Sequence, residues 1–207
     1  MVSKDGTVTC DARELREHVS AAGKIATASR VAQRADFYRR QGRRIVFTNG
    51  CFDILHRGHI EYLNRAKALG DVLIVGINSD ESVRRLKGPT RPINPLDDRL
   101  QVLAALSCID HLVAFDDDTP SELIRAVRPD VFVKGGDYTR ETLPEAPLVE
   151  QLGGRVELLP FVDDRSTSGI IERIREAYAK PDGTGSRSAA GRSQRKFVEP
   201  RRTRSLR

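Results

Sequence analysis

Two histidines three residues apart are the strongest candidates for chemistry in this sequence. The segment 48–59 reads TNGCFDILHRGH, and the run 44–47 before it has the length and β-branched content of a short buried strand. A strand that passes through a glycine-bearing turn into a helix points free N–H groups and the positive end of the helix dipole at one spot, which suits a phosphate. His56 and His59 would share a face of that helix start, with Gly58 leaving bare backbone between them. The segment therefore predicts a phosphate-binding active site.

Two cations further along the chain could supply charge to the same phosphates. Lys87 and Arg91 lie in segment 87–94, whose glycine and prolines predict a loop able to close over the site. A lysine offers a point charge and an arginine a bidentate fork, although loop charges of this kind are also often simply solvated. Arg99, on the next predicted helix, could reach the same phosphates or lie on the helix surface.

Two later segments combine chain turns with polar groups. The first consists of Lys134, Gly135, Gly136 and Asp137. It places flexible backbone at a strand end, followed by a carboxylate suited to the hydroxyl groups of ribose or another sugar. The second consists of Arg165, Ser166, Thr167 and Ser168. Because it precedes a helix, its hydroxyls can cap that helix while the arginine and the free N–H groups hold a triphosphate; an ordinary turn and an ordinary cap are the alternatives.

Strands and helices alternate along the chain as a parallel sheet requires. Apolar runs predict five strands at residues 44–47, 71–77, 111–115, 131–134 and 156–159. Helices are predicted at residues 12–22 and 31–40, after His56, and at 80–86, 95–107, 120–127, 146–152 and 167–179. Right-handed crossovers then give an α/β fold, a single Rossmann-like domain with a five-stranded parallel sheet flanked by helices. Every candidate motif falls at a carboxyl strand end, where such folds bind ligands.

The length and composition fit one globular domain. A chain of 207 residues with 39% hydrophobic content can bury one substantial core. No apolar stretch approaches the roughly 20 residues that span a bilayer, and the N-terminus lacks the apolar core of a signal peptide, so we expect a cytoplasmic protein without a membrane partner. The cysteines, Cys10, Cys51 and Cys108, are odd in number and form no Cys-x-x-Cys pair, which argues against disulfides or structural zinc.

The motifs together resemble a known family. The sequence around His56 resembles the HxGH signature of the nucleotidyltransferase superfamily, which includes cytidylyltransferases and pantetheine-phosphate adenylyltransferase. The resemblance continues in order through segments 87–92 (KGPTRP), 98–103 (DRLQVL), 133–138 (VKGGDY) and 165–168 (RSTS). This set is similar to the adenylyltransferase domain of ADP-heptose synthase over roughly residues 24–178. The two-domain enzyme of that family begins with a sugar kinase, whereas only about forty residues precede the first strand here, so we expect a stand-alone transferase.

The resemblance implies a reaction and a set of roles. A sugar 1-phosphate, expected to be D-glycero-β-D-manno-heptose 1-phosphate, would attack the α-phosphorus of ATP and release pyrophosphate, with Mg²⁺ accompanying ATP and no protein metal ligand. The implied catalytic residues are His56, His59 and Lys87, and the implied acceptor-binding residues are Asp53, Lys87 and Arg91. The implied nucleotide-binding residues are Thr48, Asn49, Gly50, Cys51, Phe52, Gly58, His59, Lys134, Gly135, Gly136, Asp137, Arg165, Ser166, Thr167 and Ser168.

The charge of the chain is concentrated at its C-terminal end. The formal net charge is +6, and residues 180–207 alone carry nine Lys or Arg against two acidic residues, so residues 1–179 have a net charge of −1. We therefore expect a partly ordered N-terminal extension at 1–28, the nucleotidyltransferase domain at 29–179, and a basic, disordered tail at 180–207. Weak contacts of this tail with polyanions such as nucleic acid are the alternative to a purely solvated extension.

Two other functions stay open at this point. A cytidylyltransferase acting on glycerol phosphate or a related alcohol phosphate would use the same histidine pair and the same helix cap. A non-catalytic nucleotide- or nucleic-acid-binding protein that relies on the basic tail belongs to a different class, and the intact set of cationic donors weighs against it. The sequence also leaves the oligomeric state open, with a homodimer as one option.

Overall fold

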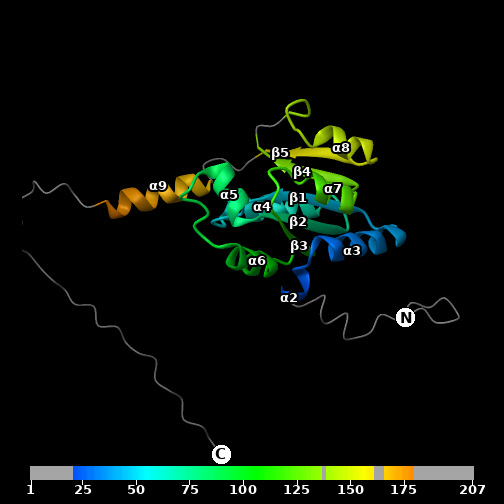
Figure 1. The fold of residues 1–207 in the computed structure, drawn as a ribbon, viewed down its shortest axis with the longest axis horizontal. Helices are drawn as coiled ribbons and strands as arrows, with labels where there is room; N and C mark the ends of the chain where they lie inside the picture. The colour runs from blue at the N-terminus through cyan, green and yellow to red at the C-terminus, as the bar shows by residue number, and fades with distance from the viewer. Residues whose placement is uncertain (1–20, 137–138, 161–165, 180–207) are drawn as a thin grey trace, which may run out of the picture.

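A five-stranded, all-parallel sheet forms the centre of the protein, in the strand order β3-β2-β1-β4-β5 (Figure 1). The computed structural model describes residues 21–136, 139–160 and 166–179 of the chain. The strands are β1 (Ile45–Gly50), β2 (Val72–Asn78), β3 (His111–Phe115), β4 (Val131–Gly135) and β5 (Arg155–Leu159). The predicted α/β fold class, with its five parallel strands, is confirmed.

Helices connect successive strands and cover the sheet. Within the described ranges they are α2 (Ala21–Lys24), α3 (Ala28–Arg40), α4 (Arg57–Lys67), α5 (Asp80–Lys87), α6 (Leu96–Ala104), α7 (Ser121–Val127), α8 (Ala146–Gln151) and α9 (Thr167–Tyr178). Residues 12–20 of the helix predicted at 12–22, most of the expected N-terminal extension and the whole basic tail lie outside the described residues, whereas residues 21 and 22 belong to α2. None of the helices in the described part of the chain is long and apolar enough to cross a membrane.

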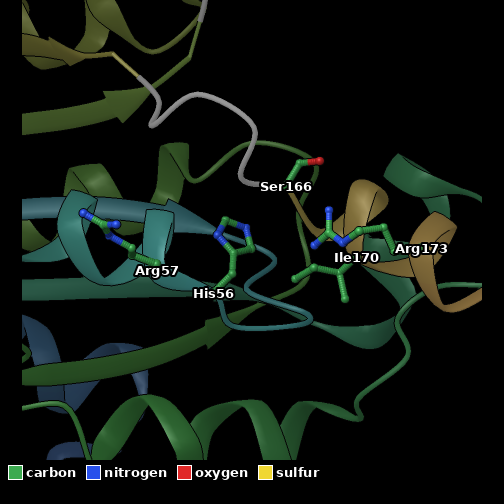
Figure 2. Close-up of a pocket in the computed structure, with 5 residues that line it drawn as sticks. All are labelled: His56, Arg57, Ser166, Ile170 and Arg173. Carbon is green, nitrogen blue, oxygen red and sulfur yellow. The ribbon is translucent and has the colours of Figure 1, made fainter.

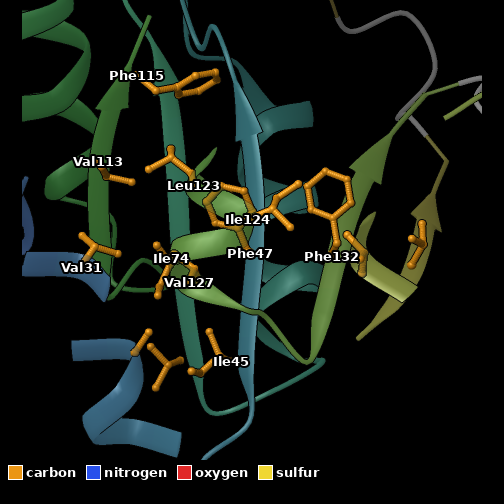
Figure 3. Packing of buried hydrophobic residues seen from close by; sticks show 14 of the residues in the cluster. Val31, Ile45, Phe47, Ile74, Val113, Phe115, Leu123, Ile124, Val127 and Phe132 are labelled. Atoms are coloured by element: carbon orange, nitrogen blue, oxygen red, sulfur yellow. The ribbon is translucent and has the colours of Figure 1, made fainter. Parts of the chain in front are cut away.

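The core lies on both faces of the sheet, which explains why its strands are apolar throughout. All seven residues of β2 are buried. Alternate strand positions supply two clusters. Ile45 and Phe47 pack with α3, α7 and α8 on one face (Figure 3). Val46 packs with α4 and α6 on the other face. Full burial of such a side chain contributes roughly 1.5–3 kcal/mol. The two-sided core therefore fixes the strands whose ends carry the site.

The strand order creates a topological switch point at the carboxyl end of the sheet. From β1 the chain adds β2 and β3 on one side, and it then crosses over to add β4 and β5 on the other. Connections that leave β1 and β4 therefore diverge, and open α/β sheets bind ligands at such a point. Helix α4 follows β1 here, and α9 projects from the same side of the molecule (Figure 1).

Candidate active site

The two histidines lie at the start of α4 with their rings stacked. His56 is the extended N-cap residue, and its side chain makes no capping hydrogen bond. The ring centroids of His56 and His59 are 3.8 Å apart with an interplanar angle of 29°. The ring of Phe52 lies against His59 from the other side, at a centroid distance of 5.2 Å. The structure therefore brings the two imidazoles together, as the spacing predicts.

His59 is an uncharged imidazole at neutral pH. Burial, followed by the neighbouring charge of His56, lowers the pKa of His59 from 6.5 to about 4. Its Nδ1 atom is buried and has no hydrogen-bond partner among the described residues. Because a buried polar atom without a partner costs free energy, a ligand group that satisfied His59 would be favoured. His59 can thus offer a directed N–H group to a phosphate without contributing a positive charge.

A cavity of about 330 Å³ joins the start of α4 to the start of α9 (Figure 2). Its lining residues are His56, Arg57, Ser166, Ile170 and Arg173. Ser166 caps α9, since its Oγ accepts a hydrogen bond from the Gly169 N–H at 3.0 Å. Thr167 ties this helix start to the loop after β1 by donating from Oγ1 to the Ile54 carbonyl oxygen at 3.2 Å. Two helix N-termini, far apart in sequence, therefore face one cavity.

The segment predicted as a turn begins as strand. Thr48, Asn49 and Gly50 belong to β1, and the hydroxyl groups of Thr48 and Tyr62 lie 2.7 Å apart. Tyr62 also donates to the Val133 carbonyl oxygen of β4 at 3.1 Å, so one side chain joins β1, α4 and β4. Burial raises the pKa of Tyr62, which keeps its hydroxyl protonated for this bond.

The turn itself starts after Gly50 and depends on the absence of a side chain there. A Cβ atom on Gly50 would lie only 2.9 Å from the ring of Phe52. Phe52 has a positive φ of 47°, a conformation that L-residues seldom adopt, and its ring folds back toward the strand end. This backbone path places the Phe52 ring against His59.

Asp53 holds a loop, which differs from its expected role as an acceptor ligand. Its buried carboxylate accepts hydrogen bonds from Arg91 Nε at 2.5 Å, the Ile93 N–H at 2.8 Å and the Asn94 N–H at 2.9 Å. Burial alone would raise the pKa of Asp53, but the bonds from Asn94, Ile93 and Arg91 outweigh it and lower that pKa. Both carboxylate oxygens and Arg91 Nε are engaged, so the pair clasps loop 88–95 beside the site.

Lys87 and Arg99 also depart from their expected settings. Lys87 is the last residue of α5, and the loop begins at Gly88, which has a φ of 96°. Arg99 is buried and donates to the Cys51 carbonyl oxygen at 2.6 Å and to Asp80 at 2.8 Å. The predicted position of Arg99 on the helix surface is wrong, because its side chain is buried and its guanidinium holds the turn after β1. Burial raises the pKa of the Cys51 thiol, although Lys87, Arg99 and Arg91 oppose this.

Lys134 stands at the end of β4, in reach of β1 and α8. Its Nζ lies 3.1 Å from Asn49 Oδ1 and 3.3 Å from Oε1 of the buried Glu145. Gly135 ends the strand, and Gly136 follows with a φ of 122°. The predicted site residues Asp137 and Arg165 lie outside the described residues.

Comparison with known proteins identifies the family. A model of the cytidylyltransferase-like family matches residues 47–177, which is more than half of the chain and includes both helix starts at the cavity. The chain belongs to this family. The family predicted from the ordered motifs is therefore confirmed.

Relatives of this cytidylyltransferase-like chain are longer proteins. It is 52% identical over 183 residues to bifunctional protein HldE of Syntrophotalea carbinolica, and 50% identical over 182 residues to that of Trichlorobacter lovleyi. Each alignment covers 86% of this chain and 37% of the relative, so the chain spans a little over a third of their length. A crystal structure of a lipopolysaccharide core biosynthesis protein from Thermoplasma volcanium is 32% identical, with a TM-score of 0.48, and covers 58% of this chain and 98% of that one.

Four residues of this cytidylyltransferase-like site were missed by motif reasoning, and one of them, Arg57, lies between the predicted His56 and Gly58. Ile170 and Arg173 lie four and seven residues after Ser166, a spacing that places them on the same helix face, so periodicity could have found them. Glu145, the N-cap residue of α8, lies 3.3 Å from Lys134 Nζ, and no local pattern in the sequence predicts that contact.

Proposed function

We propose that this chain is an adenylyltransferase that joins AMP from ATP to a sugar 1-phosphate, giving a nucleotide sugar and pyrophosphate. We assign D-glycero-β-D-manno-heptose 1-phosphate as the acceptor and ADP-heptose as the product. The observation that carries the proposal is the single cavity shared by His56 at the start of α4 and Ser166 at the start of α9. The sugar assignment is supported by the ordered motifs and by about half-identity to the HldE relatives. A reaction that consumes ATP also fits the cytoplasmic location expected from the sequence.

The reaction needs positioning and charge stabilisation more than a base. A phosphomonoester has a second pKa near ~6, so the attacking oxygen is largely ionised at neutral pH. That oxygen forms a bond to the α-phosphorus of ATP. The bond from the α-phosphorus to the oxygen that bridges to the β-phosphate breaks, and pyrophosphate leaves with the electron pair. Since every participant is anionic, fixed N–H donors and cations lower the barrier.

The residues at the two helix starts have complementary roles in this proposal. His56, His59 and the free N–H groups at the start of α4 bind the α-phosphate and the charge that develops on it. Ser166, Thr167 and Ser168 present hydroxyl and N–H groups of the α9 start to the rest of the triphosphate. A third group of residues lies at the ends of β1 and β4, and we assign it to binding of the nucleoside. Its members are Thr48, Asn49, Gly50, Cys51, Phe52, Lys134, Gly135 and Gly136.

The acceptor enters from the side of the clasped loop. Lys87 at the end of α5 would supply a positive charge to the acceptor phosphate. Arg91 donates a hydrogen bond from Nε to Asp53. This bond fixes the orientation of the guanidinium, so its remaining N–H groups can point toward the acceptor phosphate. Asp53 is assigned a positioning role, because it orients Arg91 and the loop.

Magnesium enters the proposal through the nucleotide. Among the described residues, no group of three or more His, Cys, Asp or Glu side chains could hold a metal ion. Mg²⁺ prefers phosphate and water oxygens and needs few protein ligands, so ATP can carry it into the cavity. When bound, it would neutralise part of the charge on the phosphates.

The decisive experiment is a substrate matrix read by pyrophosphate release. ATP and CTP are each combined with heptose 1-phosphates of both anomers and with glycerol 3-phosphate, in the presence of Mg²⁺. The proposal expects turnover with ATP and the β-anomer of the heptose 1-phosphate. Turnover with CTP and glycerol phosphate instead would show a cytidylyltransferase, and no turnover with any pair would reject the transferase assignment.

A further inference from the structure

Arg173 is the one charged residue of α9 that lines the cavity with His56. It lies seven residues after Ser166 and three after Ile170, so all three share the face of α9 that borders the cavity. In Figure 2 its guanidinium extends from α9 toward His56 rather than away from the cavity. The catalytic roles proposed above do not use this side chain.

The guanidinium of Arg173 is available to a ligand. Arg173 has no hydrogen bond or ion pair with any residue in the described part of the chain, whereas Arg175, two positions along the same helix, pairs with Glu172 at 3.1 Å. Arg173 is exposed, but its side chain borders the cavity. Here it lies in a cavity beside a capped helix start, where the other polar groups are also N–H and hydroxyl donors.

Arg173 lies close to that helix start, beside Gly169. A Cβ atom at Gly169 would be 3.2 Å from Ser166 Oγ and 3.6 Å from Arg173 Nη1. The guanidinium therefore folds back over the first turn of α9, next to the serine hydroxyl, with no side chain between them. An anion placed at the first turn of α9 would contact helix N–H groups and the arginine fork together.

We propose that Arg173 binds the β- and γ-phosphates of ATP and stabilises pyrophosphate as it leaves. His56 on α4 lines the opposite side of the cavity, with the His59 ring stacked on it, and the pair is assigned to the α-phosphate, so a triphosphate that spans the cavity has its far end at α9. Negative charge accumulates at that end when the bond to the α-phosphorus breaks, and a planar guanidinium can meet two phosphate oxygens at once. The identity of the nucleotide rests on the proposed function, but the affinity for pyrophosphate does not.

The test compares pyrophosphate and AMP binding by calorimetry in the full chain. Arg173→Ala should weaken Mg²⁺-pyrophosphate binding about 10- to 100-fold, the scale of a charge-assisted hydrogen-bond pair, and leave AMP binding within about twofold. Arg173→Lys keeps the charge but not the fork, and it should give an intermediate loss. Arg175→Ala is the matched control, because it removes an exposed arginine of the same helix, and it should bind pyrophosphate as the unmodified protein does.

Each outcome bears on the proposal. Unchanged pyrophosphate affinity in Arg173→Ala would overturn it, and so would an equal loss of AMP and pyrophosphate affinity, because the contact would then not be specific to the leaving group. Because Arg173 is exposed, Arg173→Ala should keep a normal circular dichroism spectrum, and the lysine variant provides the comparison if it does not. If no pair of substrates gave turnover, the calorimetric binding of pyrophosphate could still be measured. The proposed function and the proposed role of Arg173 can therefore be rejected separately.

Discussion

Two helix starts face the same cavity, but they are built differently. Helix α4 is anchored in the core, since Leu63 and Ala66 on it are fully buried. All residues of α9, Thr167–Tyr178, are described by the structure, and none of them is buried. Helix α4 begins without a side-chain cap, whereas Ser166 caps α9. The α4 corner of the cavity is thus fixed by packing in the core, whereas the α9 corner is held by the Ser166 cap and by the hydrogen bond from Thr167 to the Ile54 carbonyl oxygen.

The difference in packing between the two helices fits different roles for their N-termini. Chemistry at the α-phosphorus requires donors fixed to within a fraction of an ångström, and a helix locked into the core provides them. The pyrophosphate end must be held and then released, and a helix with little buried surface can adjust at low cost. The predictions that follow test whether the α4 corner sets rate and stability while the α9 corner sets affinity.

The largest effect is expected where the loop is clasped beside the α4 corner. Asp53→Ala would leave the Arg91 guanidinium and two backbone N–H groups without their buried partner, so the free energy of unfolding should fall by about 3 kcal/mol. The matched control is Asp36→Ala, which removes an exposed Asp–Arg pair of equal length, 2.5 Å, and should cost less than about 1 kcal/mol. Urea denaturation measures both, and equal losses would show that the clasp contributes no special stability.

The next effect is on rate. His59→Ala removes a preorganised donor from the α4 corner and should lower kcat by ~10²-fold or more, with little change in pyrophosphate affinity. His59→Gln, which keeps an N–H group, should retain part of the activity. Steady-state pyrophosphate release measures kcat for each variant. Near-normal turnover of the alanine variant would remove His59 from the mechanism and with it the contrast between the two corners.

Burial of His59 should also make stability depend on pH. The unfolded chain has the ordinary histidine pKa of 6.5, whereas the folded value is about 4. At pH values between 4 and 6.5, His59 is protonated in the unfolded chain but stays neutral in the folded protein. The contribution of His59 is therefore complete above pH 6.5 and is lost as the pH falls toward 4, by on the order of 2 kcal/mol.

Urea denaturation at pH 7, 5.5 and 4.5 tests this dependence. The unmodified protein should lose more stability with acid than His59→Gln does, because the variant lacks the titrating imidazole while its other groups still titrate. Parallel curves for the two proteins would contradict the buried, neutral state of His59.

Most of the sheet could be predicted because each strand is buried on both faces. The apolar run at 71–77 differs by one residue at each end from β2, Val72–Asn78. The end of β1 was harder to place: Thr48 is polar, yet it is fully buried because its hydroxyl lies 2.7 Å from that of Tyr62. A contact made by a side chain from another element leaves no periodic signal, so the strand was predicted too short.

The site divides in the same way between local and distant contacts. The histidine pair and the Ser166 cap depend on spacings of three residues, which a sequence displays directly. Asp53 and Arg99 have their roles set by partners up to 48 residues away, at Ile93 and at Cys51. Sequence reasoning therefore assigned Asp53 to the acceptor and left Arg99 open between the phosphates and the helix surface, because a distant partner inside the protein leaves no signal in the local sequence.

The smallest effect is expected at the cap of α9. Ser166→Ala removes the acceptor of the Gly169 N–H and should cost about 1 kcal/mol of unfolding free energy, whereas Ser168→Ala, on the same turn but not the cap residue, should change it by less than about 0.5 kcal/mol. Pyrophosphate affinity should fall in Ser166→Ala while kcat at saturating ATP changes little, since the proposal assigns the leaving group to the α9 corner and the reacting phosphorus to the α4 corner. A large loss of kcat with unchanged affinity would reverse the roles of the two corners.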